Sequence, residues 1–568
     1  MNGAQLLSRL LAQLGFRHAF GLPGTQNAPL YNELRRSPVR LIPATHELSA
    51  GFMALGYAAT SGRPALLTLI GGPGISFATT PLLEALLDSI PLLCIVCSRA
   101  PTPGKKFGAQ QIDLQGLGQA TCKEVISITS PDELISGILM ALAATTAGEP
   151  GPVLAAVDTE LLTRPVTPNL VSQLDQIDQL WAQQQESRRR GSRNGVEVAE
   201  ELVSRIAPRS RTLVFAGRGT LAAAPGLRRL IEHHQWPVVT TSSARGVIPE
   251  DHPLCLPWDL IEANVVQPWV DSFDHVVALG VKFSHNGSKA FQLRLDPQKL
   301  LHVDSSPQAL NGNYPAAYTA QADVPGVIAG WLDRIGPAGA EDSLEHHELN
   351  IWRSRCTIST PASQLPRVSG VTPATPAGWF HELRNLLPRD GILVLDSGQH
   401  QTHGRSHYRS YAPGGLLFPT GLQSMGFAIP AAIGAQLAAP ERPVVAVLGD
   451  GGLRMCGLDL LTAQSERLPL QVVVWDDGHY GLIRVQQLDY DGSEAGVRLP
   501  PMDYCRWSEG LLVEYIDCSQ DLRLAWSNPF ARRQPRLLHV TVGDTLITRA
   551  ARTKSHLRGA VGRWWPKG

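Results

Sequence analysis

Short apolar runs alternate with glycine-rich turns and with segments of helical periodicity along most of the chain. Apolar runs bounded in this way are typical of strands buried in a parallel sheet, and their alternation with helices favours a doubly wound α/β fold. A helix is expected over residues 47–61, with Thr45 as its N-cap. Strands are expected at 19–22, 40–43, 65–70, 92–96, 153–157, 212–216, 237–241, 275–279, 299–303 and 471–475.

Three blocks of this pattern are separated by polar stretches. The chain has 568 residues, which is more than one hydrophobic core normally supports. Residues 183–194 show no apolar periodicity and are interpreted as part of a linker. We therefore predict three doubly wound parallel-sheet domains of the α/β class. They span residues 1–170, 195–335 and 371–548, with linkers at 171–194 and 336–370 and a basic tail at 549–568.

The charges of the chain balance, with 50 Lys and Arg against 50 Asp and Glu. A dedicated nucleic-acid-binding protein normally carries a clear basic excess, so we expect no nucleic-acid partner. No run approaches the roughly 20 apolar residues that cross a bilayer. The leucines of residues 6–14 recur at helical spacing, unlike a signal-peptide core. We expect no membrane partner and a cytoplasmic protein.

The eight cysteines are scattered and suggest a reducing compartment. Cys94 and Cys97 form a lone CxxC inside an apolar run, with no second pair at zinc-site spacing. A buried strand is the better interpretation of that run than a redox or metal site.

Candidate chemistry is concentrated where two apolar runs end. The first run, Val-Val-Ala-Val-Leu, is followed by Gly449, Asp450, Gly451 and Gly452. Glycines let backbone N–H groups approach a phosphate closely, and an aspartate beside them can hold Mg²⁺. The second run ends at Asp477, and successive parallel strands can deliver such residues to one edge of a sheet. A glycine turn and an Asp-Gly turn are the alternative, but the two strand ends together favour a diphosphate and metal site.

This segment resembles the thiamine diphosphate (thiamine pyrophosphate, ThDP) motif of the pyruvate decarboxylase and acetolactate synthase superfamily. The motif begins with Gly-Asp-Gly and closes, after a helix and a strand, on an Asn or Asp metal ligand. Asp450 and Asp477 stand 27 positions apart, as in that superfamily. The resemblance implies Mg²⁺ ligation by these two carboxylates and by the backbone carbonyl of His479.

Further segments carry the same resemblance through nearly the whole chain. Thr45-His-Glu47 resembles the segment of the catalytic glutamate, which hydrogen-bonds the cofactor's pyrimidine ring. Phe77 stands where relatives often have Asn. By this resemblance the first domain binds the pyrimidine ring of the cofactor, the second is a central module, and the third binds the diphosphate. The implied cofactor contacts outside the glycine motif are Ser397, Gly398, Gln399, His400, Gln423, Met425, Tyr480 and Ile483.

Acetolactate synthases are the nearest likeness for the reaction. Gln110 stands 63 residues after Glu47. It resembles an active-site glutamine of the synthases, which follows their catalytic glutamate at the same spacing. A loop glutamine exposed to solvent is an equal alternative. We expect decarboxylation of a 2-oxo acid, pyruvate or a larger one, with ligation of the product to a second carbonyl. A non-ligating decarboxylase is the alternative, and an inactive ThDP-binding regulatory subunit is a further one.

The resemblance also bears on flavin and on assembly. Residues 280–287 lack the Arg and Asp residues that flavin-binding relatives carry in this place, so we expect no FAD. Glu47 and Asp450 belong to different blocks of the chain, and in the family they meet across a subunit interface. The resemblance therefore implies a homodimer or homotetramer with active sites shared between chains.

Overall fold

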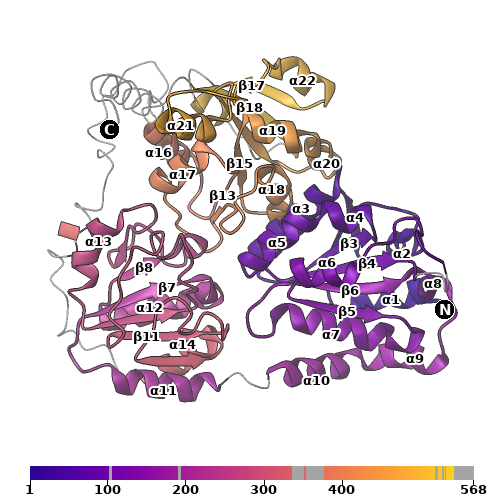
Figure 1. Ribbon diagram of the computed structural model, residues 1–568, viewed down its shortest axis with the longest axis horizontal. Helices are drawn as coiled ribbons and strands as arrows, with labels where there is room; N and C mark the ends of the chain where they lie inside the picture. The colour runs from indigo at the N-terminus through magenta and orange to yellow at the C-terminus, as the bar shows by residue number, and fades with distance from the viewer. Residues whose placement is uncertain are drawn as a thin grey trace, which may run out of the picture. The chain divides into compact units, whose positions relative to one another are not determined.

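The protein is described from a computed structural model (Figure 1). Most of the predicted linker at 336–370 and the whole tail at 549–568 lie outside the described residues. The described residues are 1–100, 105–189, 193–335, 349, 351–352, 376–518, 522–526, 530 and 533–542.

The chain forms two compact units. The first unit comprises Met1–Ile358 with Arg409–Leu416 and Thr420–Leu422, and it contains two six-stranded sheets. The second unit comprises Ser359–Tyr408, Leu417–Pro419 and Gln423–Gly568. It contains the third six-stranded sheet, so the three predicted α/β modules are confirmed.

The N-terminal sheet has the strand order β2-β1-β3-β4-β6-β5, and its strands pair in parallel. Figure 1 shows α3 and α5 on one side of this sheet and α7 on the other. Cys94 and Cys97 are fully buried and free in β4, as a core strand requires. The strands are β1 (His18–Gly21), β2 (Arg40–Pro43), β3 (Ala65–Ile70), β4 (Leu92–Ser98), β5 (Glu124–Ile128) and β6 (Pro152–Asp158). The helices are α1 (Gly3–Gln13), α2 (Ala28–Leu34), α3 (Glu47–Ser61), α4 (Pro73–Phe77), α5 (Thr79–Leu87), α6 (Leu114–Thr121), α7 (Leu134–Thr146), α8 (Thr159–Thr163), α9 (Pro168–Gln173) and α10 (Ile177–Arg189).

Helix α3 has the predicted bounds, but its N-cap is His46 rather than Thr45. The Nδ1 atom of His46 accepts a hydrogen bond from the Leu48 N–H at 3.1 Å, which satisfies one of the free amides of the first turn. Much of the predicted linker at 171–194 is also helical, because α10 continues to Arg189.

The central sheet has the order β12-β11-β10-β7-β8-β9 and packs its own apolar core. Within the described ranges, no helix combines the length and apolar character needed to cross a bilayer. The strands are β7 (Thr212–Ala216), β8 (Val238–Thr240), β9 (Cys255–Leu256), β10 (His275–Leu279), β11 (Leu300–Asp304) and β12 (Tyr318–Gln321). The helices are α11 (Gly195–Arg205), α12 (Ala224–His234), α13 (Ala263–Val270) and α14 (Val324–Leu332).

The third sheet has the order β14-β13-β15-β16-β18-β17. Strands β15 and β16 are buried along almost their full length, as strands covered on both faces require. The strands are β13 (Ile392–Leu395), β14 (Leu416–Leu417), β15 (Val444–Gly449), β16 (Gln471–Asp476), β17 (Glu514–Asp517) and β18 (Arg536–Thr541). The helices are α16 (Pro376–Leu386), α17 (Gln399–His407), α18 (Ala428–Ala438), α19 (Asp450–Cys456), α20 (Leu460–Ser465), α21 (Gly481–Tyr490) and α22 (Tyr504–Gly510).

Two buried carboxylates at the end of α5 hold residues 420–422 within the first unit. Glu84 accepts the N–H groups of Gly421 at 2.8 Å and Leu422 at 3.0 Å. The hydroxyl of Thr420 donates to Asp88. Burial and the charge of Asp88 raise the pKa of Glu84 to about 7, although the two amide hydrogen bonds oppose this. The charge of Glu84 therefore changes as the pH passes through neutrality.

Replacing Glu84 with glutamine should make stability less dependent on pH. The carboxyl pKa is about 4.5 in an unfolded chain and about 7 here, so the folded protein binds this proton more tightly. The wild type should therefore lose up to about 3 kcal/mol of stability through this group between pH 4.5 and 7, and the glutamine variant should not. Thermal unfolding midpoints are measured for both proteins at pH 5, 6, 7 and 8. The midpoint of the variant should rise relative to that of the wild type as the pH increases. The exposed Glu160→Gln variant should show no such trend, and a pH-independent difference for Glu84→Gln would contradict the assignment.

Candidate functional site

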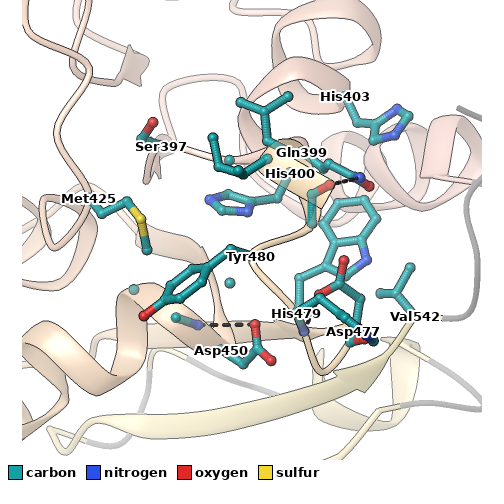
Figure 2. A pocket seen from close by; sticks show the side chains of 18 residues that line it. Ser397, Gln399, His400, His403, Met425, Asp450, Asp477, His479, Tyr480 and Val542 are labelled. Atoms are coloured by element: carbon teal, nitrogen blue, oxygen red, sulfur yellow. Dashed lines mark hydrogen bonds between the residues drawn. The ribbon is translucent and has the colours of Figure 1, made fainter. Parts of the chain in front are cut away.

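A cavity opens at the carboxyl ends of β13, β15 and β16 in the second unit (Figure 2). Its empty space is about 650 Å³, including the mouth that is open to solvent. Ligands of open α/β sheets bind at this edge, because the strand ends and the following helix N-termini converge there. Residues far apart in the sequence, from Ser397 to Val542, form its wall.

The cavity brings together every residue predicted for this unit except Gln423. Their individual roles stay predictions. The predicted residues in the wall are Ser397, Gly398, Gln399, His400, Met425, Gly449, Asp450, Gly451, Gly452, Asp477, His479, Tyr480 and Ile483. The sequence interpretation did not include five further wall residues, which are His403, Trp475, Gly481, Leu482 and Val542.

Three helices begin at the cavity, and the residue before each of them provides no side-chain cap; within α19, Oδ1 of Asp450 accepts the Gly451 N–H at 3.0 Å. Helix α17 follows Gly398, α19 follows Gly449 and α21 follows Tyr480, and none of these preceding residues caps the helix through its side chain. The first amide N–H groups of a helix lack partners within that helix, and they carry partial positive charge. Their convergence makes this edge of the sheet suitable for an anion such as a diphosphate.

The glycines after β15 are required by close packing. A Cβ atom on Gly451 would lie 2.6 Å from a ring carbon of Tyr480 and 3.0 Å from the Met425 methyl carbon. A Cβ atom on Gly452 would lie 2.4 Å from Oδ2 of Asp396. These positions bring backbone rather than side chains to the cavity, which fits a bound phosphate group.

His400 presents an unpartnered nitrogen in the cavity wall (Figure 2). Its side chain is buried, and its Nε2 atom has no hydrogen-bond partner. Burial lowers the pKa of His400 to about 3, against the opposing hydrogen bond to the Asp396 backbone. The ring is therefore neutral at physiological pH without a ligand. It would bind a phosphate oxygen through Nε2 once that atom carries a proton, and the negative charge of a bound diphosphate favours that protonation.

His403 is a wall residue that the sequence motifs did not single out. It lies on helix α17, is buried, and stacks on Trp475 with ring centroids 5.9 Å apart. Burial lowers its pKa to about 4. The spacing of positions 400 and 403, three residues apart, places both on one face of a helix, and this was the available signal.

The cavity contains an excess of negative charge around Asp450. Burial, followed by the charges of Asp477 and Asp476, raises the pKa of Asp450 to about 7. Burial also raises the pKa of Asp477, whose Oδ1 accepts the His479 N–H at 3.0 Å. Asp476 behaves differently, because the hydrogen bond from His539 at 3.1 Å lowers its pKa in spite of burial.

A hard cation would relieve this repulsion, and carboxylate oxygens are the ligands that Mg²⁺ prefers. Asp450 and Asp477 thus fit the predicted metal site. No cluster of three or more His, Cys, Asp and Glu side chains suited to a metal ion occurs in the part of the chain that the structure describes. The predicted set has only two such side chains, with a backbone carbonyl as its third ligand.

Glu47 and Gln110 belong to the other unit, and their predicted roles stay predictions. Glu47 is the first residue of α3 and is half-buried. The side chain of Phe77, in the position where relatives often have Asn, is half-exposed and lies against His46 with ring centroids 4.6 Å apart. Gln110 lines a second cavity, at the carboxyl ends of β3, β4, β5 and β6.

Comparison with known protein families gives three matches in chain order. Residues 1–117 match the N-terminal TPP binding domain of thiamine pyrophosphate enzymes. Residues 199–330 match their central domain, and residues 396–540 match their C-terminal TPP binding domain. The last match contains the whole glycine motif and both predicted carboxylate ligands.

Individual relatives cover nearly the whole chain. The probable 2-ketoarginine decarboxylase AruI of Pseudomonas aeruginosa is 31% identical over an alignment of 506 positions, which covers 88% of this chain and 86% of the relative. The acetolactate synthase isozyme 1 large subunit of Escherichia coli is 27% identical over an alignment of 552 positions, which covers 95% of this chain and 94% of the relative. A probable acetolactate synthase large subunit of Methanocaldococcus jannaschii is 26% identical, covering 95% of this chain and 92% of the relative. Together with the three domain matches, these relatives show that the chain belongs to the thiamine pyrophosphate enzyme family.

Proposed function

We propose that this ThDP-dependent enzyme uses Mg²⁺, decarboxylates a 2-oxo acid and joins the product to a second carbonyl compound, as the name acetolactate synthase implies for its relatives. The observation that carries the proposal is the cavity of the second unit. Uncapped helix N-termini, the free Nε2 of His400 and two mutually repelling carboxylates converge there. This combination suits a diphosphate bridged to a divalent cation.

The residues that would hold the cofactor follow from the cavity wall. The backbone of Gly449–Gly452 and the ring of His400 would bind the diphosphate, and Met425 would support the cofactor rings. Asp450, Asp477 and the carbonyl of His479 would hold Mg²⁺. When bound, ThDP supplies a carbon nucleophile that attacks the 2-oxo group and accepts the electron pair left by departing CO₂.

The protein's own side chains would control protons, orientation and water. Glu47 would hold a proton at the pyrimidine N1′ atom of the cofactor. Apolar wall residues such as Leu482 and Ile483 would exclude water from the reacting atoms. Gln110 would donate a hydrogen bond to the carbonyl oxygen of the acceptor.

We also propose a homodimer or homotetramer in which Glu47 of one copy serves the cofactor bound by Asp450 of another. The two residues lie in different units of the chain, and the proposed reaction needs both at one cofactor. The absence of FAD is part of the same proposal and rests on the sequence of residues 280–287.

A non-ligating decarboxylase is the second candidate, supported by the 31% identity with the probable 2-ketoarginine decarboxylase. Within its described wall, the second unit's share of the proposed site offers a guanidinium no acidic partner beyond the predicted metal ligands. Its carboxylates are those of Asp450 and Asp477, the predicted metal ligands, and its other side chains include Trp475, Ile483 and Val542. A cationic group would therefore find no additional acidic partner among these described wall residues.

Product analysis tests the choice between these reactions. The protein, loaded with ThDP and Mg²⁺, is incubated with pyruvate, larger apolar 2-oxo acids and 2-ketoarginine, each with and without a panel of aldehydes and 2-oxo acids as acceptors. We expect new C–C bonds with an apolar donor. Free aldehyde as the sole product would support the non-ligating decarboxylase, and no turnover of any donor would support an inactive regulatory subunit.

A further inference from the structure

Gln26, which the sequence interpretation did not single out, contacts the side chain of Gln110 in the first unit. The Nε2 atom of Gln26 lies 3.0 Å from Oε1 of Gln110. Gln26 is buried, with 5% of its surface exposed, whereas Gln110 is exposed at the second cavity. That cavity has about 820 Å³ of empty space, including the part open to solvent.

The orientation of the two amides follows from a backbone group. The N–H of Gly71 is shared between the Cys97 carbonyl oxygen and Oε1 of Gln26, both at 2.8 Å. A backbone N–H can only donate, so Gln26 must direct its oxygen towards Gly71 and its NH₂ towards Gln110. Gln110 must then accept through its oxygen, and its own NH₂ remains available as a donor.

The backbone of Gln110 is held in a restricted conformation beside this contact. Its φ angle is +61°, a left-handed value that residues other than glycine rarely adopt. A Cβ atom on Gly72 would lie 2.9 Å from both Cβ and the carbonyl oxygen of Gln110, so only glycine permits this approach. Strain of this kind persists where the surrounding structure determines a side-chain position.

We infer that Gln26 is a positioning residue that orients the Gln110 amide, so that Gln110 presents N–H donors to the acceptor carbonyl oxygen. This inference rests on the proposed function, because it gives Gln110 the role of acceptor-binding residue. The donor orientation favours a substrate oxygen over an N–H or O–H donor at the same place. Without Gln26, the Gln110 amide can rotate and present its oxygen instead.

A Gln26→Glu variant tests this orientation with little change of shape. While ionised, the carboxylate still accepts the Gly71 N–H but can only accept from Gln110, and so reverses that amide; because burial favours the protonated form, the variant is assayed at pH 7, 8 and 9 and the effect should grow with pH. We expect the ratio of ligated product to free aldehyde to fall about 10- to 100-fold, as expected when a buried donor–acceptor pair becomes mismatched. Consumption of the donor 2-oxo acid should change less than threefold.

Two comparisons separate positioning from general disturbance. Gln111→Glu places the same charge on the wall of the same cavity and keeps the acceptor for the Gly108 N–H, so its product ratio should match the wild type. In a Gln110→Ala background, Gln26→Glu should cause no further loss, because it acts only through Gln110. An undiminished effect in that background, or a wild-type ratio in the single variant, would overturn the inference.

The inference can fail separately from the proposed function. If the wild-type protein releases only aldehyde, ligation is refuted. The wild type, Gln26→Glu, Gln110→Ala and the double variant are then compared by their KM for the 2-oxo acid. The oxygens of that substrate are the remaining acceptors for Gln110. A non-additive rise in KM of tenfold or more supports the role of Gln26, and an unchanged KM overturns it.

Discussion

Replacing Glu47 with glutamine is expected to lower turnover by about 10²- to 10⁴-fold, the range associated with loss of one acid–base group. Glutamine keeps the length of the side chain and a carbonyl oxygen, but it carries no negative charge to hold a proton at the pyrimidine nitrogen. The affinity for ThDP should change little, because the predicted diphosphate and metal contacts all lie in the second unit. The measurements are kcat at saturating ThDP and Mg²⁺ and the ThDP dissociation constant by titration calorimetry.

Glu197→Gln provides a matched control for this variant. Glu197 also lies in the first turn of a helix, α11, and its side chain is exposed. The same substitution there should leave both kcat and ThDP affinity at wild-type values. Full activity of the Glu47→Gln variant would remove Glu47 from the mechanism, whereas loss of ThDP binding would give it a role in cofactor retention.

The part of the site that could be predicted from the sequence consists of strand ends and short motifs. Strands β15 and β16 are apolar and bounded by glycines or aspartates, so the convergence of Asp450 and Asp477 followed from parallel pairing. Helix α3 could be predicted equally well from the sequence, because its apolar residues and the Gly62 that follows it mark its two ends. Local patterns of this kind do not depend on the rest of the fold.

The remaining wall residues depend on contacts that no local pattern records. Val542 reaches the cavity because β18 pairs with β16, with Thr541 opposite Asp476. Helix α17 has a polar sequence without apolar periodicity, yet it is buried because Gly404 allows close packing on Leu395. No helix could consequently be predicted around His403. Strands β9 and β14 have only two residues each, which is too short for any hydrophobic pattern.

Replacing Asp450 with asparagine is expected to separate stability from metal binding. Asparagine retains an oxygen that can accept the Gly451 N–H, which Oδ1 of Asp450 accepts at 3.0 Å. It removes a buried negative charge that lies close to Asp476 and Asp477. The metal-free variant should therefore unfold at the same temperature as the wild type or at a higher one, most clearly at pH 8, where the wild-type carboxyl is ionised.

The same substitution should lower Mg²⁺ affinity by about 100-fold or more, since even residues that only support metal ligands usually contribute 10- to 100-fold. Added Mg²⁺ and ThDP, each at 100 times its dissociation constant, should stabilise the wild type by about 2.7 kcal/mol per ligand and the variant far less. Calorimetric titration and thermal unfolding with and without both ligands measure these effects.

Asp491→Asn is the control for this variant, because Asp491 lies in the same unit, is exposed and is not part of the cavity wall. Its Mg²⁺ affinity and its stabilisation by both ligands should match those of the wild type. A metal-free Asp450→Asn protein that is clearly less stable would show that the carboxylate supports the fold, and wild-type Mg²⁺ affinity would exclude Asp450 as a ligand. The predicted combination, unchanged or higher stability with loss of metal binding, is what a buried charge kept for a cation requires.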